Sequence, residues 1–236
     1  MTTAIPAAEI ARNLVIANRI LGHEGIVDAW GHVSVRHPDR PDRFLLSRAR
    51  APELVEEADL LEFSLDGEPV APADVGLYSE RFIHAAVYEA RPDVTAVCHN
   101  HALSVLPFSI SRSVRLTPVV HTGSYLGGEV PVWDIADEFG TSTTMLVETV
   151  EQGRSLSRTL ANGPVALMRG HGSVVAGANL EKLVTLCMAM DRNAKVQLQA
   201  AQLGEVTALH PGEVATRLGR DRDSRAWEYW SRRAGF

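Results

Sequence analysis

The sequence is poor in cysteine and aromatic residues and has no long apolar run. Only two of its 236 residues are cysteines, Cys98 and Cys187, so a disulfide framework is excluded and a reducing compartment is indicated. No stretch of about 18 apolar residues is present to cross a bilayer. The first residues also lack the basic and apolar regions of a signal peptide. We therefore expect a cytoplasmic protein with no membrane partner.

Basic residues are outnumbered by acidic ones. The 23 Lys and Arg against 29 Asp and Glu give a net charge of −6, so the chain lacks the general positive field that attracts nucleic acid. The exception is the segment 217–233, where arginines surround Trp227, Tyr229 and Trp230. In an acidic chain this pattern favours a solvated helix face or a tail that docks on a neighbouring subunit. We expect a small-molecule partner and no nucleic acid.

Hydrophobic residues make up 45% of the chain, which is enough for the core of one domain. Helical spacing of apolar residues and capping signals predict helices over 6–24, 79–90, 141–152, 155–161 and 179–203. Alternating or continuous apolar runs predict strands over 32–36, 44–47, 60–70, 94–101, 116–120, 130–133 and 165–169. The strand spacing is too irregular for a simple parallel sheet, so we expect a layered α/β domain with a mixed sheet. No repeat or linker divides residues 1–236, and 204–236 is expected to be a C-terminal tail near a subunit interface.

Two histidines stand two residues apart in a predicted strand. Side chains at this spacing point to the same face, so His99 and His101 can reach one metal ion. His171 lies between two glycines where a strand ends, and Glu80 lies at the start of the helix that leads back to the His99 strand. Each feature alone has an ordinary explanation: a core or surface histidine pair, a turn residue, or a helix-start carboxylate favoured by the helix dipole. Together, three imidazoles and a carboxylate match a catalytic metal site with an open position for substrate.

A family resemblance follows from these motifs and their order. The segments that carry it are Gly31-His32-Val33-Ser34-Val35-Arg36, Tyr78-Ser79-Glu80-Arg81-Phe82-Ile83-His84, Arg91-Pro92-Asp93-Val94-Thr95-Ala96-Val97-Cys98-His99-Asn100-His101-Ala102, Arg169-Gly170-His171-Gly172 and Asn179-Leu180-Glu181. Over roughly residues 8–203 the chain resembles the class II aldolase/adducin family. The resemblance implies a single three-layer α/β/α domain with a mixed, largely antiparallel sheet, and a homotetramer with active sites at subunit interfaces.

The resemblance also implies a ligand set. His99, His101 and His171 would hold one divalent metal ion per subunit, and Glu80 would be the acid/base that also binds the metal when substrate is absent. Adducin-type members that have lost these ligands are structural proteins, so a non-catalytic interaction module is one alternative. Because all four residues are present, we expect a metal-dependent enzyme. Three nitrogens and an oxygen favour zinc, with manganese, iron or cobalt as alternatives.

The branch of the family is indicated by departures from its phosphate-binding pattern. Sugar-phosphate aldolases and epimerases use a Gly-Thr-x-Gly-Asn-x-Ser turn, a Thr-Gly further along, and a Ser-Ser-Glu at the helix start. Here the turn reads Ala29-Trp30-Gly31-His32-Val33-Ser34, a second region reads Ser47-Arg48-Ala49-Arg50, and Tyr78 replaces the first serine of the last motif. Guanidinium groups suit carboxylates as well as phosphate, and the aromatic residues suit a flat ring. The alternative is that Arg48 and Arg50 form surface salt bridges and that Trp30 belongs to the core.

The Gly-His-x-Ser-x-Arg turn resembles that of metal-dependent decarboxylases of hydroxylated aromatic or pyridine dicarboxylates, of the 3,4-dihydroxyphthalate decarboxylase type. In this hypothesis the metal acts as a Lewis acid on a small-molecule carboxylate substrate. Arg48 or Arg50 would anchor the retained carboxylate, His32 would lie near the carboxylate that leaves, and Glu80 would protonate the ring carbon. The alternative function is an aldolase or epimerase acting on a small hydroxy-carbonyl or sugar-phosphate substrate.

Further candidate contacts to the substrate come from positions that match the family's binding motifs. They are Ser34, Ser47, Ser79 and His121. His121 aligns with a family histidine near the neighbouring subunit, but the tyrosine that follows it in some aldolases is Thr122 here. This removes an expected proton donor and favours decarboxylation over aldol cleavage.

Overall fold

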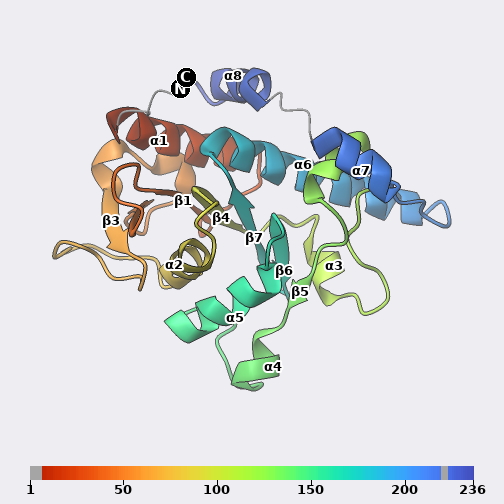
Figure 1. The fold of residues 1–236 in the computed structure, drawn as a ribbon, viewed down its shortest axis with the longest axis horizontal. Coiled ribbons are helices and arrows are strands. Elements are labelled where there is room, and N and C mark those ends of the chain that lie inside the picture. The colour runs from red at the N-terminus through yellow and green to blue at the C-terminus, as the bar shows by residue number, and fades with distance from the viewer. Residues whose placement is uncertain (1–6, 219–222) are drawn as a thin grey trace.

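The computed structural model describes residues 7–218 and 223–236, and its centre is a seven-stranded sheet (Figure 1). The strands are β1 (His32–Arg36), β2 (Arg43–Ser47), β3 (Leu60–Ser64), β4 (Ala96–Asn100), β5 (Val132–Trp133), β6 (Val165–Met168) and β7 (Gly172–Gly177). Their order is β3-β2-β1-β4-β7-β6-β5, and every neighbouring pair is antiparallel except β5 and β6. The prediction of a mixed, largely antiparallel sheet is confirmed.

Helices cover both faces of the sheet. They are α1 (Ala7–His23), α2 (Arg81–Ala90), α3 (Leu106–Ile110), α4 (Ile135–Phe139), α5 (Val150–Leu160), α6 (Leu180–Ala201), α7 (Pro211–Leu218) and α8 (Asp223–Arg233), with short 3-10 helices η1 (Pro52–Leu54), η2 (Glu57–Asp59) and η3 (His121–Leu126). One core lies between the sheet and the pair α1 and α6, and a second lies between the sheet and the pair α2 and α5. The fold is therefore the predicted three-layer α/β/α domain.

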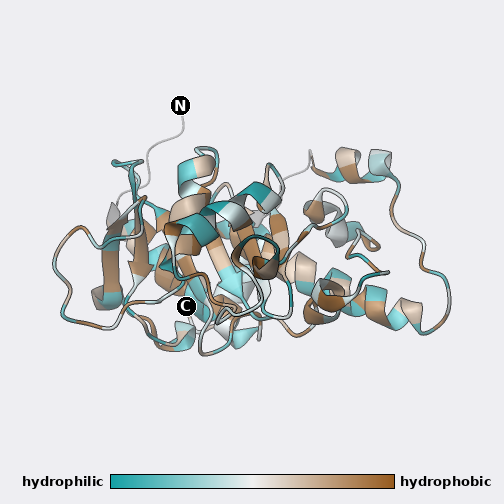
Figure 2. Cartoon of the chain, turned by 90° about the horizontal axis from the view of Figure 1, so that it is seen from below, coloured by the Kyte–Doolittle hydropathy of each residue, from teal (hydrophilic) through white to brown (hydrophobic). Residues whose placement is uncertain are grey.

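Alternation along β4 shows how one strand serves both cores. Ala96 and Cys98 belong to the core under α1 and α6, whereas Val97 belongs to the core under α2 and α5. In Figure 2, hydrophobic positions are frequent in the strands, and the helices carry both hydrophobic and hydrophilic positions. Position 99 shares the face of Val97, so this alternation directs His99 toward the α2 side of the sheet.

Some predicted elements are wrong, and side-chain hydrogen bonds explain two of them. Residues 141–149 are not helical, because Thr149 caps α5 in a reciprocal pair with Gln152 and starts the helix at Val150. The segment 116–120 does not form a strand, because its backbone N–H groups bond to side chains of α6. The predicted helix 155–161 is the second part of α5, and strand β7 was not predicted.

The N-cap of helix α2 lies one residue later than Ser79, the cap expected for the predicted helix 79–90. Its first helical residue is Arg81, and the N-cap position belongs to Glu80, which makes no side-chain capping bond. The carboxylate of Glu80 is therefore turned away from its own helix and is available to the histidines described below. In contrast, the predicted cap of α6 is confirmed, because Asn179 Oδ1 accepts from Lys182 N at 2.7 Å.

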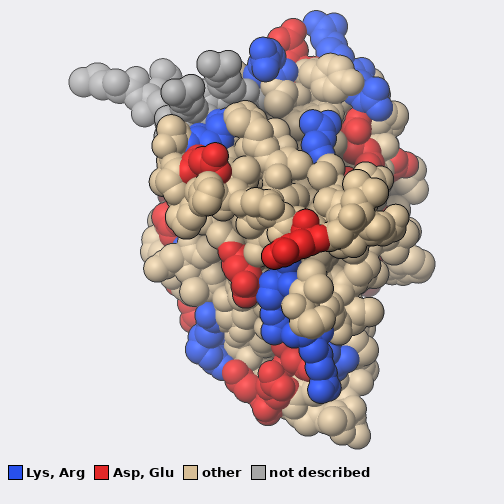
Figure 3. Space-filling view, turned by 90° about the vertical axis from the view of Figure 1, so that its right-hand side faces the viewer, with Lys and Arg blue, Asp and Glu red and all other residues tan. Residues whose placement is uncertain are grey.

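The C-terminal segment packs on its own chain. Helix α7 contacts η3, and α8 contacts both α1 and α6, with an Arg233 to Glu24 ion pair of 2.6 Å. Arg220 and Arg222 of the predicted basic segment lie outside the described residues. Figure 3 shows acidic and basic side chains lying next to one another on the side where α7 lies. Among the helices of 7–218 and 223–236, none is long and apolar enough to cross a membrane.

Candidate metal centre

Strand pairing brings the predicted ligands to one place. His99 is the fourth residue of β4 and pairs with His32 of β1 on one side and with Val174 of β7 on the other. His101 follows β4 directly, and His171 lies in the turn that joins β6 to β7. Glu80 reaches the same point from the start of α2. Residues from three separate segments of the sequence thus converge at one end of adjacent strands.

The four side chains form a compact cluster. Glu80, His99, His101 and His171 each offer one ligand atom, and these atoms lie within 4.8 Å of one another. The Nε2 atoms of His99 and His101 are 2.9 Å apart. Glu80 Oε2 lies 3.3 Å from His99 Nε2 and 3.5 Å from His171 Nε2. The ring nitrogens that face one another are Nε2 in each case.

The outward ring nitrogen of each of the three histidines lies within hydrogen-bond distance of an oxygen that can only accept. His99 Nδ1 lies 3.1 Å from Ser173 O, His101 Nδ1 lies 3.0 Å from an Asp28 carboxylate oxygen, and His171 Nδ1 lies 2.9 Å from Met145 O. Carbonyl and carboxylate oxygens only accept hydrogen bonds, so each Nδ1 donates its proton and each Nε2 is left with a lone pair. Three inward lone pairs and one carboxylate fit the donor set of a divalent transition metal ion.

The carboxylate of Glu80 is held as an anion. The side chain is buried, and its Oε1 accepts from Val147 N at 3.0 Å. Burial raises the pKa of Glu80, but His99 and His171, when their inward nitrogens carry a proton in place of a metal ion, outweigh it and bring the pKa far below its usual range. An ionised carboxylate suits a ligand or a proton acceptor.

The segment 141–149 was missed as part of the site. Besides supplying Val147 N to Glu80, it supplies Met145 O to His171, and Met145 holds a left-handed φ of 65°. Few non-glycine residues adopt such a φ, and those that do cluster at functional sites. The capping pair of Thr149 and Gln152 was the sequence signal that could have excluded a helix here.

A cavity of about 370 Å³ opens beside the cluster. Its lining is Ala29, Trp30, His32, Ala49, Arg50, Ala51, Tyr78, Ser79, Glu80, His101 and Leu146. The rings of Tyr78 and His32 are 4.5 Å apart. Trp30 is 72% exposed, so it lies at the rim of the cavity and not in the core. Four of the predicted catalytic or substrate residues, His32, Arg50, Ser79 and Glu80, reach this wall.

The two predicted anchoring arginines are placed differently. Both pair with the buried carboxylate of Asp59, Arg48 at 2.7 Å and Arg50 at 2.6 Å, but only Arg50 also lines the cavity. Arg50 uses Nη1 for its ion pairs with Asp59 and Glu56. Its Nη2 makes no hydrogen bond to another described residue, so this edge of the guanidinium is available to a ligand. Asp59 has no motif signal, since its role depends on contacts between separate loops.

Three other predicted substrate residues do not reach the cavity wall. Ser34 is fully buried behind His32, and Ser47 is buried beside Tyr78 at 3.5 Å. Both face inward because their strands pack under α2 and the Tyr78 ring. His121 is exposed in η3, away from the lining of this cavity. Within one chain, these residues therefore cannot contact a ligand in the cavity.

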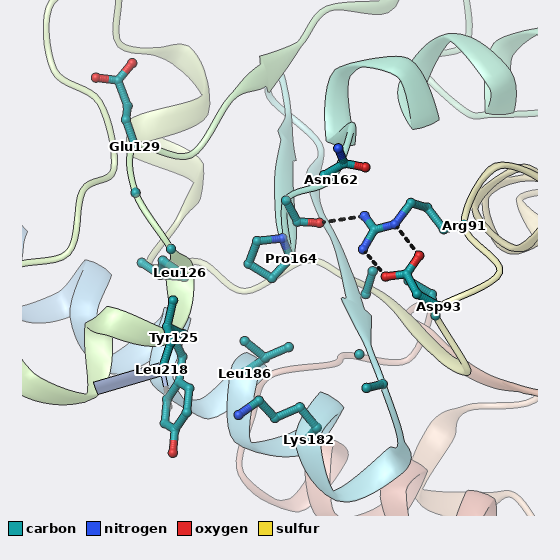
Figure 4. A pocket seen from close by; sticks show the side chains of 17 residues that line it. Arg91, Asp93, Tyr125, Leu126, Glu129, Asn162, Pro164, Lys182, Leu186 and Leu218 are labelled. Carbon is teal, nitrogen blue, oxygen red and sulfur yellow. Dashed lines mark hydrogen bonds and ion pairs between the residues drawn. The ribbon is translucent and has the colours of Figure 1, made fainter. Parts of the chain in front are cut away.

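A larger cavity of about 550 Å³ lies elsewhere and is less suited to chemistry (Figure 4). Arg91 on its wall is already paired with Asp93 at 2.7 Å and donates to Gly163 O at 3.2 Å. Lys182 lies over the Tyr125 ring, 4.1 Å from its centroid. Among the described residues, no histidine or cysteine lines this cavity. The cluster of Glu80 with the three histidines is therefore the candidate active site.

An α/β/α layered fold that brings three histidines and a glutamate to one end of its sheet defines a protein with a candidate catalytic metal centre. Residues 12–198 match the family model for the class II aldolase and adducin N-terminal domain. The chain belongs to the class II aldolase and adducin family.

Two curated relatives and one solved structure extend this result. The chain is 34% identical over 220 residues to decarboxylase tropJ of Talaromyces stipitatus, covering 88% of this chain and 82% of the relative. It is 29% identical over 206 residues to 3,4-dihydroxyphthalate decarboxylase of Arthrobacter keyseri, covering 81% and 78%. An aldolase II superfamily protein of Pseudomonas syringae shares the fold, with a TM-score of 0.80, 20% identity and coverage of 99% and 94%. The chain is thus a class II aldolase-like lyase with decarboxylase relatives.

Proposed function

We propose that this protein is a metal-dependent decarboxylase of a hydroxylated aromatic or pyridine dicarboxylate such as 3,4-dihydroxyphthalate. The observation that carries the proposal is the cavity, in which the candidate metal centre adjoins Tyr78, Trp30 and Arg50 in place of a small-hydroxyl phosphate cradle. Aromatic walls suit a planar ring, and a guanidinium edge suits a carboxylate. The decarboxylase relatives support the same reaction class.

His99, His101 and His171 would hold the ion, with Glu80 as a fourth ligand before substrate binds. When bound, a divalent ion supplies Lewis acid chemistry at a substrate oxygen, and zinc suits this nitrogen-rich donor set. Manganese, iron or cobalt with additional waters also fits these ligand types.

The other steps of the reaction are carried out by side chains that line the cavity. Arg50 binds the carboxylate that stays, through the guanidinium edge that Asp59 does not occupy. Glu80 Oε2 takes the proton of the substrate hydroxyl and returns it to the ring carbon after the carbon-carbon bond to carbon dioxide breaks. The electron pair of that bond remains on the ring carbon until the proton arrives. His32 binds the carboxylate that leaves.

Assembly belongs to the same proposal. Large apolar side chains are exposed near the cluster: Trp30 at 72%, Leu103 at 81% and Ile110 at 62%. Leu103 follows His101 by two residues, and Ile110 lies beside the glycine that precedes His171. Apolar groups around a site mouth suit burial against another subunit. A cytoplasmic homotetramer with active sites between subunits, where His121 or the 204–236 segment completes a neighbour's cavity, fits this surface.

The test is carbon dioxide release from purified protein reconstituted with zinc or manganese. Hydroxylated phthalates and pyridine dicarboxylates are compared with sugar 1-phosphates scored for aldehyde. We expect release from an ortho-hydroxylated dicarboxylate, and its loss when a chelator removes the metal. Glu80→Gln should abolish turnover, whereas the control Glu89→Gln, at an exposed ion pair with Arg154, should not. Aldehyde formation without carbon dioxide would assign the protein to the aldolases.

A further inference from the structure

Strand β1 and helix α2 bury a chain of polar side chains behind the cavity. Val33 and Val35 face the core under α1 and α6, so His32 and Ser34 face the opposite side, toward α2. On α2, His84 and Tyr88 are four residues apart and share one helix face. All four of these polar side chains are at most 1% exposed. Three of these residues, His32, Ser34 and His84, lie in the motifs quoted above, but the candidate metal centre uses none of the four.

Short contacts connect the four residues in a line. His32 Nδ1 lies 2.6 Å from His84 Nε2, and His84 Nδ1 lies 2.6 Å from Ser34 Oγ. Ser34 Oγ lies 2.7 Å from the Tyr88 hydroxyl, where the line ends. The Arg36 guanidinium lies 4.8 Å from the Tyr88 ring centroid and donates to Tyr88 O at 2.7 Å. The inner end of the line is therefore fixed in place.

The inner end also determines the direction of every hydrogen bond. Tyr88 is fully buried, burial raises the pKa of its phenol, and so the hydroxyl keeps its proton. Within the described residues Ser34 Oγ is the only side-chain or carbonyl oxygen that can accept this proton. Tyr88 therefore donates to Ser34, because a buried hydroxyl without an acceptor is costly.

The remaining protons follow from the geometry of each gap. Since Tyr88 donates to Ser34 Oγ, the proton of Ser34 has no acceptor among the described residues other than His84 Nδ1. Ser34 therefore donates to His84 Nδ1. A neutral imidazole carries one proton, so His84 carries it on Nε2 and donates it to His32 Nδ1. His32 Nδ1 is then an acceptor, and the ring proton of His32 is on Nε2.

His32 lines the cavity wall, and its Nδ1 is engaged by the buried His84. No hydrogen bond joins His32 Nε2 to another described residue. Nε2 is therefore the ring nitrogen that is left for a ligand in the cavity.

We propose that Tyr88, Ser34 and His84 are positioning residues that fix His32 in the tautomer with its proton on Nε2, so that His32 presents a hydrogen-bond donor to an anionic oxygen of the substrate. This proposal deepens the proposed function, because it gives the binding group for the carboxylate that leaves. The site then offers two kinds of histidine. His99, His101 and His171 direct lone pairs toward the candidate metal centre, whereas His32 directs an N–H toward the cavity.

The consequence is selection by hydrogen-bond polarity. An anionic oxygen at this position satisfies the N–H of His32, whereas a hydroxyl acts there only as a neutral acceptor. Hydrogen bonds to charged groups are about twice as strong as neutral ones. The site should therefore favour a carboxylate, and His32 in this tautomer cannot accept a proton from the substrate at Nε2.

The direct test is the tautomer of His32 in the full-length zinc-loaded protein labelled with ¹⁵N-histidine. Two-bond proton–nitrogen correlations show which ring nitrogen is protonated, and the His32→Gln variant identifies the His32 signals by their loss. We expect the proton of His32 on Nε2 only. In Ser34→Ala and in the more conservative Tyr88→Phe, we expect a second His32 tautomer, whereas Tyr229→Phe, at an exposed tyrosine, leaves one.

Ligand binding gives the second measurement. Phthalate, a dicarboxylate without hydroxyl groups, should shift the His32 Nε2–H signal, and Tyr88→Phe should raise its dissociation constant several-fold. A proton on His32 Nδ1 in the parent protein would overturn the proposal. So would a single unchanged His32 tautomer in both Ser34→Ala and Tyr88→Phe, or the absence of a shift of the His32 signal on addition of phthalate. These readouts need no turnover, so a failed decarboxylation assay and a failed tautomer assignment are distinguishable.

Discussion

Replacing Asp28 by asparagine should weaken metal binding without changing the ligands themselves. Asp28 Oδ1 accepts from Trp30 N at 2.9 Å and from Gly31 N at 3.0 Å, which fixes the turn before β1. The same carboxylate accepts from His101 Nδ1, at 3.0 Å from Oδ1 and 3.1 Å from Oδ2. Asparagine can keep the turn and one contact with His101 through its Oδ1. It loses the negative charge, however, and places an N–H where Oδ2 faces the N–H of His101. The variant therefore weakens the orientation of one candidate ligand and changes little else.

The magnitude follows from the exposure of the carboxylate. Loss of such an outer partner costs about 10- to 100-fold in metal affinity. Because the Asp28 side chain is 42% exposed, water weakens its interaction with His101 and we expect the lower end, about tenfold or ~1.4 kcal/mol. The assay is competition for Zn²⁺ with a chromophoric chelator at fixed pH. Glu89→Gln, a charge change outside the cavity lining, should leave the affinity unchanged. An Asp28→Asn affinity within twofold of the parent protein would refute the reasoning.

Three further predictions test the cavity, the buried chain and the sheet. Arg50→Ala should raise KM for a dicarboxylate several-fold in initial-rate assays, whereas Arg48→Ala should not; equal KM values would remove Arg50 from the binding site. Burial lowers the pKa of His84 to about 3, so below pH 6.5 the unfolded chain binds more protons than the folded protein. The free energy of unfolding therefore decreases as the pH is lowered. Between pH 7 and 5, His84→Gln should lose about 2 kcal/mol less stability than the parent in urea unfolding, and an equal loss would contradict this assignment. A Cβ at Gly172 would lie 2.1 Å from Asn100 O, so Gly172→Ala should cost about 1–3 kcal/mol and weaken metal binding. Gly128→Ala, at a site with open space, should do neither, and identical behaviour of the two variants would show that β7 can shift freely.

The clustering of the candidate ligands could be predicted from the sequence because its signals are local. The spacing of His99 and His101 depends only on the two-residue period of a strand, and that period holds wherever the strand lies. The glycines beside His171 indicated a close approach, and Gly172 does lie against the backbone of β4. The layered fold was likewise predictable, since amphipathic helices and apolar strands alternate along the chain.

The tertiary structure alone decided what surrounds those ligands. Asp28 and Met145 hold the outer nitrogens of His101 and His171, and Asp59 separates the roles of Arg48 and Arg50. None of these contacts has a spacing rule, because they join loops whose separation is fixed by strand order and helix packing.

The buried chain behind His32 shows the same division. Sequence determines that His84 and Tyr88 share a face of α2, and that His32 and Ser34 share a face of β1. Only the packing of α2 against β1 brings the two faces within hydrogen-bond distance and excludes water from between them. The sequence thus determines two periodic patterns of polar residues, one on α2 and one on β1. The direction of the hydrogen bonds between them, and hence which ring nitrogen of His32 carries the proton, is determined only in the folded protein.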